Sequence, residues 1–201
     1  FGIDKPQASL LELFKDLPIA ITSFMVASFL PLLGYRRAMM GALTIVGGAC
    51  LLMPMFPGFH TTEFLFACVG VSFALAKVAV YSSIGLLTAD RAEHSRLTNM
   101  IEGLFMVGVL AGGWLFSAFV DPAAPGDTRW LRVYWLLALI CAAVIALLAA
   151  SPLDESAARD ETPRSAASTV GQMLQLMARP LVYVFLLSAF LYVLIDRKSV
   201  V

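Results

Sequence analysis

The stretch FLFACVGVSFALAKVAVYSSIGLLT, residues 64–88, decides the fold of this chain. Lys77 is its single charged residue, and the other residues are apolar or carry a hydroxyl group. A helix needs about 20 such residues to cross a hydrocarbon core of roughly 30 Å. The stretch therefore predicts a membrane-spanning helix with one ammonium group near its middle.

The composition of the whole chain points to the same class of protein. Of its 201 residues, 60% are hydrophobic and 14% are charged, whereas soluble domains have roughly 45–50% apolar and about 25% charged residues. The abundance of Phe, Leu, Val and Ile excludes a disordered chain. The formal net charge is zero, so no basic surface indicates nucleic acid as a partner. We predict an all-α, polytopic membrane helix bundle.

Apolar runs of sufficient length define the expected spans. The five complete runs are Leu17–Leu33, Ala38–Phe56, Phe64–Thr88, Met100–Val120 and Trp130–Ser151. A sixth run, Leu181–Ile195, would reach only about 22 Å at about 1.5 Å per residue, as a span cut short would. Pro57–His60 and Asp90–Arg96 are expected to be loops, and Thr98 or Asn99 is expected to cap the helix after the second of them.

The positions of Lys and Arg set the expected orientation, because cytoplasmic loops hold an excess of these residues. One set of loops contains Arg36, Arg37, Arg91, Arg96, Arg159, Arg164 and Arg179, and the opposite set contains Lys5, Lys15, Arg129 and Arg132. This bias predicts that Phe1 lies outside and that the turn at Gly34–Arg37 lies inside. We expect the protein in the inner (plasma) membrane of the cell.

The chain is expected to have four parts: residues 1–151 as an N-terminal bundle, 152–179 as a cytoplasmic linker, 180–195 as the start of a C-terminal half, and 196–201 as a tail. The tail has three charged residues, Asp196, Arg197 and Lys198, at positions where the last span should still be in hydrocarbon. A nucleotide sequence that encodes the six residues of the tail also matches a common sequencing-adapter read, so we predict that the tail is not native. The opening without Met and the short last run indicate a fragment.

The linker contains apolar residues at the spacing of an amphipathic helix. These residues are Val170, Met173, Leu174 and Met177. The spacing predicts a helix on the inner membrane surface, although an early extension of the last span fits it equally well.

Lys77 and Glu102 are the strongest candidates for a functional site. An ionisable group within a span has to face a cavity or a partner, and it marks a substrate or ion pathway by default. Lys77 could instead belong to an ion pair that fixes helix packing. Glu102 comes directly after the start of the run Met100–Val120, so we expect it roughly 13 Å from Lys77 in depth. It could also be an interfacial carboxylate that the helix N-terminus favours.

Several polar or small residues are weaker candidates. Ser23, Ser72 and Asn99 could line a solute pathway, but serines in membrane helices more often bond to their own backbone or to a neighbouring helix. The pair Gly108-x-x-x-Gly112 predicts a close approach of two helices.

Catalytic and metal-binding patterns are missing from the sequence. There is no set of nucleophile and base, no glycine-rich phosphate loop and no metal-ligand spacing. Cys50, Cys68 and Cys141 lie in apolar runs and are expected to be buried apolar residues rather than disulfides or ligands. We expect no enzyme activity, no cofactor and no metal site.

The turn after the first span resembles a motif of the major facilitator superfamily, G-x-x-x-D-R-x-G-R-R. The segment Gly34–Arg37 is similar to the second half of this motif. Ala27, Pro31 and Leu32 stand at its first glycine, its acid and the base that follows. The short alternating loops and the long inner linker before the last span are also typical of this family.

A second stretch resembles the fucose-permease-like branch of that family. Residues 94–99, which lead into Phe105 and Gly108, are similar to the entry of the branch's fifth helix, and Arg96 matches its basic residue. The branch has a functional carboxylate in its fourth helix, whereas the run Phe64–Thr88 has Lys77 and no acid. The resemblance therefore does not imply that this chain transports a sugar with a proton through such a carboxylate.

The resemblance implies a fragment with about helices two to seven of the family fold. Its function would be secondary active transport of a small solute by alternating access, coupled to H+ or another ion, in a protein that is a monomer when full length. The inner gate would include Gly34, Arg36, Arg37, Arg91 and Arg96, although these arginines could equally be plain membrane anchors. The alternative function is that of a non-transporting membrane sensor or assembly partner.

Overall fold

The computed structural model describes residues 5–120, 127–151, 171, 175 and 179–198. Its elements are α1 (Lys5–Leu33), α2 (Tyr35–Met55), α3 (Phe59–Leu87), α4 (Arg91–Phe119), the 3-10 helix η1 (Arg129–Leu131), α5 (Arg132–Ala150) and α8 (Pro180–Lys198). These described residues contain no strand, which confirms the predicted all-α class. The amphipathic segment expected at 170–177 lies almost wholly outside the described residues, as do 199–201.

Two compact units divide the chain, Phe1–Thr162 and Pro163–Val201. The second unit contains α8, which includes the predicted short run Leu181–Ile195 and continues to Lys198. The first unit contains the other helices, and the candidate site lies there.

Four segments of the described chain are long and apolar enough to cross a membrane: Tyr35–Met55, Phe59–Leu87, Arg91–Phe119 and Arg129–Ala150. They correspond to four of the five complete predicted spans. The remaining one, Leu17–Leu33, is helical within α1, which is not among these four. Helices form here because each satisfies its own backbone hydrogen bonds, as lipid requires. The chain therefore has the character of a polytopic helical membrane protein.

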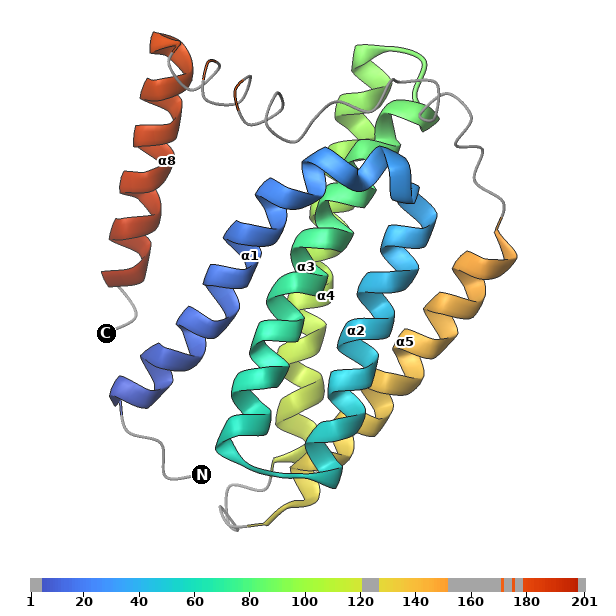
Figure 1. Ribbon diagram of the computed structural model, residues 1–201, viewed down its shortest axis with the longest axis vertical. Helices are drawn as coiled ribbons and strands as arrows, with labels where there is room; N and C mark the ends of the chain where they lie inside the picture. Colours follow the sequence, from blue (N-terminus) through green and yellow to red (C-terminus); the bar gives the residue numbers. More distant parts are fainter. Residues whose placement is uncertain (1–4, 121–126, 152–170, 172–174, 176–178, 199–201) are drawn as a thin grey trace. The chain divides into compact units, whose positions relative to one another are not determined.

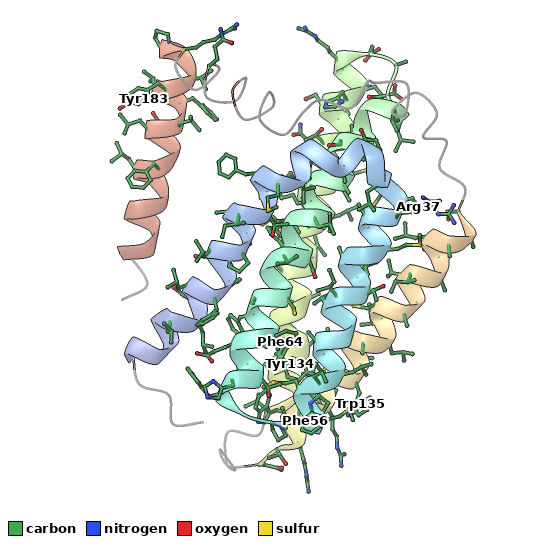
Figure 2. All side chains as sticks on the ribbon, in the orientation of Figure 1. Arg37, Phe56, Phe64, Tyr134, Trp135 and Tyr183 are labelled. Carbon is green, nitrogen blue, oxygen red and sulfur yellow. The ribbon has the colours of Figure 1, made fainter. Side chains whose placement is uncertain are left out.

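Successive helices of the first unit run in opposite directions (Figure 1). The turn between α1 and α2, the turn between α3 and α4 and the last turn of α5 lie at one end of the unit. Figure 2 shows Arg37 at this end and Phe56 and Trp135 at the opposite end. The arginines predicted to form a gate therefore share one end of the unit.

The centre of the first unit is α3, which packs against both α1 and α2, while α2 also packs against α5. The buried residues between α1, α2 and α3 are Val26, Leu30, Ala38, Ala42, Leu75 and Ala79. A second buried cluster, between α2, α3, η1 and α5, consists of Ala49, Cys50, Met53, Leu65, Leu131, Val133 and Tyr134. Helix α4 has no buried residue, and its partly buried Leu115, Phe116 and Phe119 pack against the second cluster.

Close helix approaches occur at glycines other than the predicted pair. A Cβ atom on Gly70 would overlap the carbonyl oxygen of Lys15 on α1, and one on Gly47 would lie 3.2 Å from Cβ of Cys141 on α5. At Gly108 and Gly112 a Cβ atom would meet no described atom within 4 Å. The prediction of a close approach at Gly108 and Gly112 is therefore wrong for the described part of the chain, because α4 lies outside the closely packed helices.

Helix α4 begins with a side-chain cap. Oδ1 of Asp90 accepts a hydrogen bond from the backbone N–H of Glu93 at 2.7 Å, and the Glu93 carboxylate accepts one from the N–H of Ala89 at 2.9 Å. Reciprocal bonds of this kind satisfy N–H groups that have no partner within the helix.

This cap corrects the predicted start of α4, which is Arg91 and not Met100. Residues Arg91–Arg96 belong to the helix rather than to a charged loop, and Thr98 and Asn99 lie inside it rather than at its cap. Hydropathy marks only the part of a helix that suits hydrocarbon. The first turns of α4 are polar, so hydropathy could not indicate that they are helical.

Candidate functional site

Two aromatic side chains on one face of α3 flank the candidate ammonium group of Lys77. Phe73, Lys77 and Tyr81 are spaced four residues apart, which places them one above the other on a helix. Nζ of Lys77 lies 5.7 Å from the ring centroid of Phe73 and 5.6 Å from that of Tyr81. Both distances are within the range of roughly 6 Å in which an aromatic ring attracts a cation.

Helix α4 contributes the opposite charge. Nζ of Lys77 lies 4.0 Å from Oε1 of Glu102, and the hydroxyl of Tyr81 donates a hydrogen bond to the same oxygen. Close to this contact, the rings of Phe73 and Phe105 pack with their centroids 5.8 Å apart. The two helices are therefore joined by a polar group of three residues and an aromatic pair.

The predicted offset in depth between Lys77 and Glu102 is wrong. Lys77 lies ten residues before the end of α3 at Leu87 (87 − 77), and Glu102 lies eleven residues after the start of α4 at Arg91 (102 − 91). Because α3 and α4 are antiparallel and both residues are nearly the same number of residues from the turn that joins them, Lys77 and Glu102 lie at the same position along the helix axes. At about 1.5 Å per residue this position is roughly 15 Å from the helix ends, so Glu102 does not lie beside the helix N-terminus.

A cavity of about 250 Å³ lies beside this charged pair. Its lining residues are Phe73, Ala76, Lys77, Val80, Tyr81, Ile101, Glu102 and Phe105. The side chains of Lys77 and Glu102 are 48% and 41% exposed. Three groups with polar atoms, an ammonium, a carboxylate and a phenol, therefore border a space whose walls are otherwise apolar.

The charges have a clear physical reason to be paired. A single charge at the centre of a membrane helix costs roughly 2.5–3.5 kcal/mol on insertion scales. An opposite charge and aromatic faces reduce this cost, but 4.0 Å is longer than a hydrogen bond between an ammonium and a carboxylate. The pair therefore retains capacity for further polar partners.

The remaining candidates for the pathway lie away from the cavity. Ser72 is 5% exposed, and its Oγ has no hydrogen-bond partner among the described residues. Ser23 is partly exposed on α1 and Asn99 is exposed on α4. Of the five predicted pathway residues, the structure brings together Lys77 and Glu102.

The arginine-rich end contains one specific contact between helices. Nε and Nη2 of Arg36 donate hydrogen bonds to the carbonyl oxygens of Leu148 and Ala149, at 2.7 and 2.5 Å. These carbonyls belong to the last turn of α5, where they have no helical N–H partner and where the helix dipole favours a cation. Arg36 thus ties the start of α2 to the end of α5.

Gly34 makes the turn that positions Arg36. Its φ of 86° lies in the left-handed region that side chains disfavour. The other predicted gate arginines, Arg37, Arg91 and Arg96, are exposed at the same end of the unit. The structure thus separates Arg36, which caps a helix, from three arginines that face outward.

The aromatic residues of the site were not among the predicted site residues. The spacing of Phe73, Lys77 and Tyr81 was a usable signal, because it can be read from α3 alone. Phe105 and the contact of Glu102 could be found only with the correct start of α4. The described residues hold no group of three or more His, Cys, Asp or Glu that could bind a metal ion, and the three cysteines are free.

Comparison with known proteins adds no relative. No protein-family model, no curated protein and no solved structure matches this chain.

Proposed function

We propose that this chain is part of a secondary active transporter of the major facilitator type. It moves a small solute across the membrane by alternating access, and the movement is coupled to H+ or another ion. One observation carries the proposal: Lys77, Glu102 and Tyr81 meet beside a cavity, midway along two apolar helices. Ionisable groups at this depth are costly, and they typically belong to substrate or ion pathways.

The pair also has the chemistry that coupling requires. An ion that binds one member of the pair would leave the other member without its counter-ion, and release of the ion would restore the pair. A solute that contacts either group would be sensitive to this change. Transport and ion binding would then depend on the same few atoms, as coupling demands.

Uptake of labelled solutes into proteoliposomes tests the proposal, using the protein as its complete gene encodes it. We expect the wild-type protein to accumulate at least one member of a panel of sugars, amino acids and carboxylates when an ion gradient is imposed. Lys77→Met should reduce that uptake about tenfold or more. A hydrogen bond to a charged group contributes roughly 1.5–3 kcal/mol, and about 1.4 kcal/mol corresponds to a factor of ten.

Lys15→Met is the matched control, since Lys15 is also a lysine on an apolar helix but pairs with Asp16, 3.8 Å away. Its uptake should remain close to the wild-type rate. Unchanged uptake by Lys77→Met would remove Lys77 from the mechanism. If the wild-type protein takes up no solute at all, the alternative of a membrane sensor is favoured.

A further inference from the structure

The charged pair presents unused hydrogen-bonding groups to the cavity. An ammonium group has three N–H donors, and Lys77 has as its only described polar contact Oε1 of Glu102 at 4.0 Å. Tyr81 donates to that same oxygen, and Oε2 of Glu102 has no hydrogen bond with a described residue. A cationic donor from α3 and an anionic acceptor from α4 therefore border the same cavity.

The balance of charge selects among possible ligands. Lys77 and Glu102 carry opposite charges, so a ligand with a single charge would pair with one of them and leave the other without an added partner. Such a ligand would also be repelled by the like-charged member of the pair. A ligand with one positive and one negative group keeps the site neutral and satisfies both members.

The other lining residues of the cavity indicate which kind of uncharged group the ligand has. Apart from Lys77, Glu102 and Tyr81, the cavity is lined by Phe73, Ala76, Val80, Ile101 and Phe105. These side chains offer no hydrogen bond to a polyhydroxylated solute. The cavity volume of about 250 Å³ is far above the roughly 10–15 Å³ that one water molecule needs, so the cavity admits a small organic molecule.

We propose that this cavity binds a small zwitterion with an apolar body, of which an apolar α-amino acid is the simplest example. Its carboxylate contacts Lys77, its ammonium contacts Glu102, and its side chain lies against Phe73 and Phe105. Tyr81 keeps Glu102 in place. This ligand class rests on the proposed transport function, because it names the solute of the same site.

Binding of three matched compounds to the protein that the complete gene encodes, in lipid nanodiscs, tests the inference. The compounds are L-leucine, 4-methylpentanoate, which lacks the ammonium group, and 3-methylbutylamine, which lacks the carboxylate. Wild-type protein should bind leucine about tenfold or more tightly than either analogue, since each analogue leaves one charge unpaired. Equal binding of leucine and an analogue, or no binding of any of the three, would overturn the proposal.

Charge-removing variants should reverse this preference. Glu102→Gln should weaken leucine binding and strengthen binding of 4-methylpentanoate, because the repelling carboxylate is gone. Lys77→Met should weaken leucine binding and strengthen binding of 3-methylbutylamine. Glu63→Gln is the control for Glu102→Gln, since Glu63 pairs with His60 outside the cavity, and it should keep the wild-type order.

The variants are compared only if they elute from gel filtration as the wild-type protein does, and the wild-type series alone can overturn the inference if a variant fails to fold. The two proposals can also fail separately. Uptake of another solute that depends on Lys77, without leucine binding, would support transport and reject the zwitterion. Leucine binding with the reversed preferences, without any uptake, would support the site and reject transport.

Discussion

At the level of single residues, the two charges of the site are held in different ways. Lys77 lies between two rings of its own helix, so its position depends mainly on α3. Glu102 receives a hydrogen bond from Tyr81 on the facing helix, so its position depends on how α3 and α4 meet. The carboxylate is therefore the member of the pair that a change in helix packing would displace first.

Arg36 and Arg37 offer a test of residue-specific roles, because they are neighbours in sequence and differ in contacts. Arg36→Gln should lower the free energy of unfolding by roughly 1.5–3 kcal/mol, since its hydrogen bonds to the carbonyls of Leu148 and Ala149 involve a charged donor. Arg37→Gln, at an exposed position, should change it by no more than about 0.5 kcal/mol. Unfolding by SDS titration in mixed micelles measures both values, and equal losses would refute the capping role.

At the level of helices, small residues decide which pairs pack closely. Gly70 brings α3 against the backbone of α1, and Gly47 brings α2 against α5. The glycines of α4 have open space around them instead. The presence of a small-xxx-small pattern therefore permits a close approach, but the positions of the neighbouring helices determine whether one occurs.

Alanine at two of these glycines should have opposite effects on stability. Gly70→Ala should destabilise the chain by roughly 1–3 kcal/mol, because the new Cβ overlaps the Lys15 carbonyl and forces α1 to move. Gly112→Ala should be neutral or stabilise α4 by up to about 1 kcal/mol, since alanine is the better helix former. The same SDS titration checks both variants. A loss at Gly112 as large as that at Gly70 would contradict the packing described above.

At the level of the whole first unit, the two ends differ in chemistry. One end has Arg36, Arg37, Arg91 and Arg96, whereas the other has Arg129 and Arg132 together with exposed aromatic residues such as Phe56 and Trp135 (Figure 2). Aromatic residues favour the membrane–water interface, and arginines favour the cytoplasmic side. The alternation of the helices (Figure 1) therefore predicts which loops share a side of the membrane.

Cysteine labelling in cells tests this topology on a background in which Cys50, Cys68 and Cys141 are replaced by alanine. A membrane-impermeant maleimide should label Pro57→Cys, between α2 and α3, in intact cells. Ala89→Cys and Ser151→Cys should react only after the membrane is made permeable, because they lie at the arginine-rich end. Labelling of Pro57→Cys and Ala89→Cys from the same side would refute the antiparallel arrangement.

Local sequence patterns were sufficient for the helical class and for the four helices that are long and apolar enough to cross a membrane, because apolar runs can be read along the chain. The functional role of Lys77 stays a prediction. The start of α4 could also have been predicted from the sequence, because Asp90 is followed three residues later by Glu93, as in a capping box. Hydropathy alone does not detect such a cap. The meeting of Lys77 with Glu102, the close approach at Gly70 and the cap that Arg36 places on α5 were decided by tertiary structure. Each of these contacts joins two helices, and it depends on how far apart the two helices lie and on how far one is shifted along its axis relative to the other. The residue pattern within one helix contains no information about its distance from another helix or its shift relative to it.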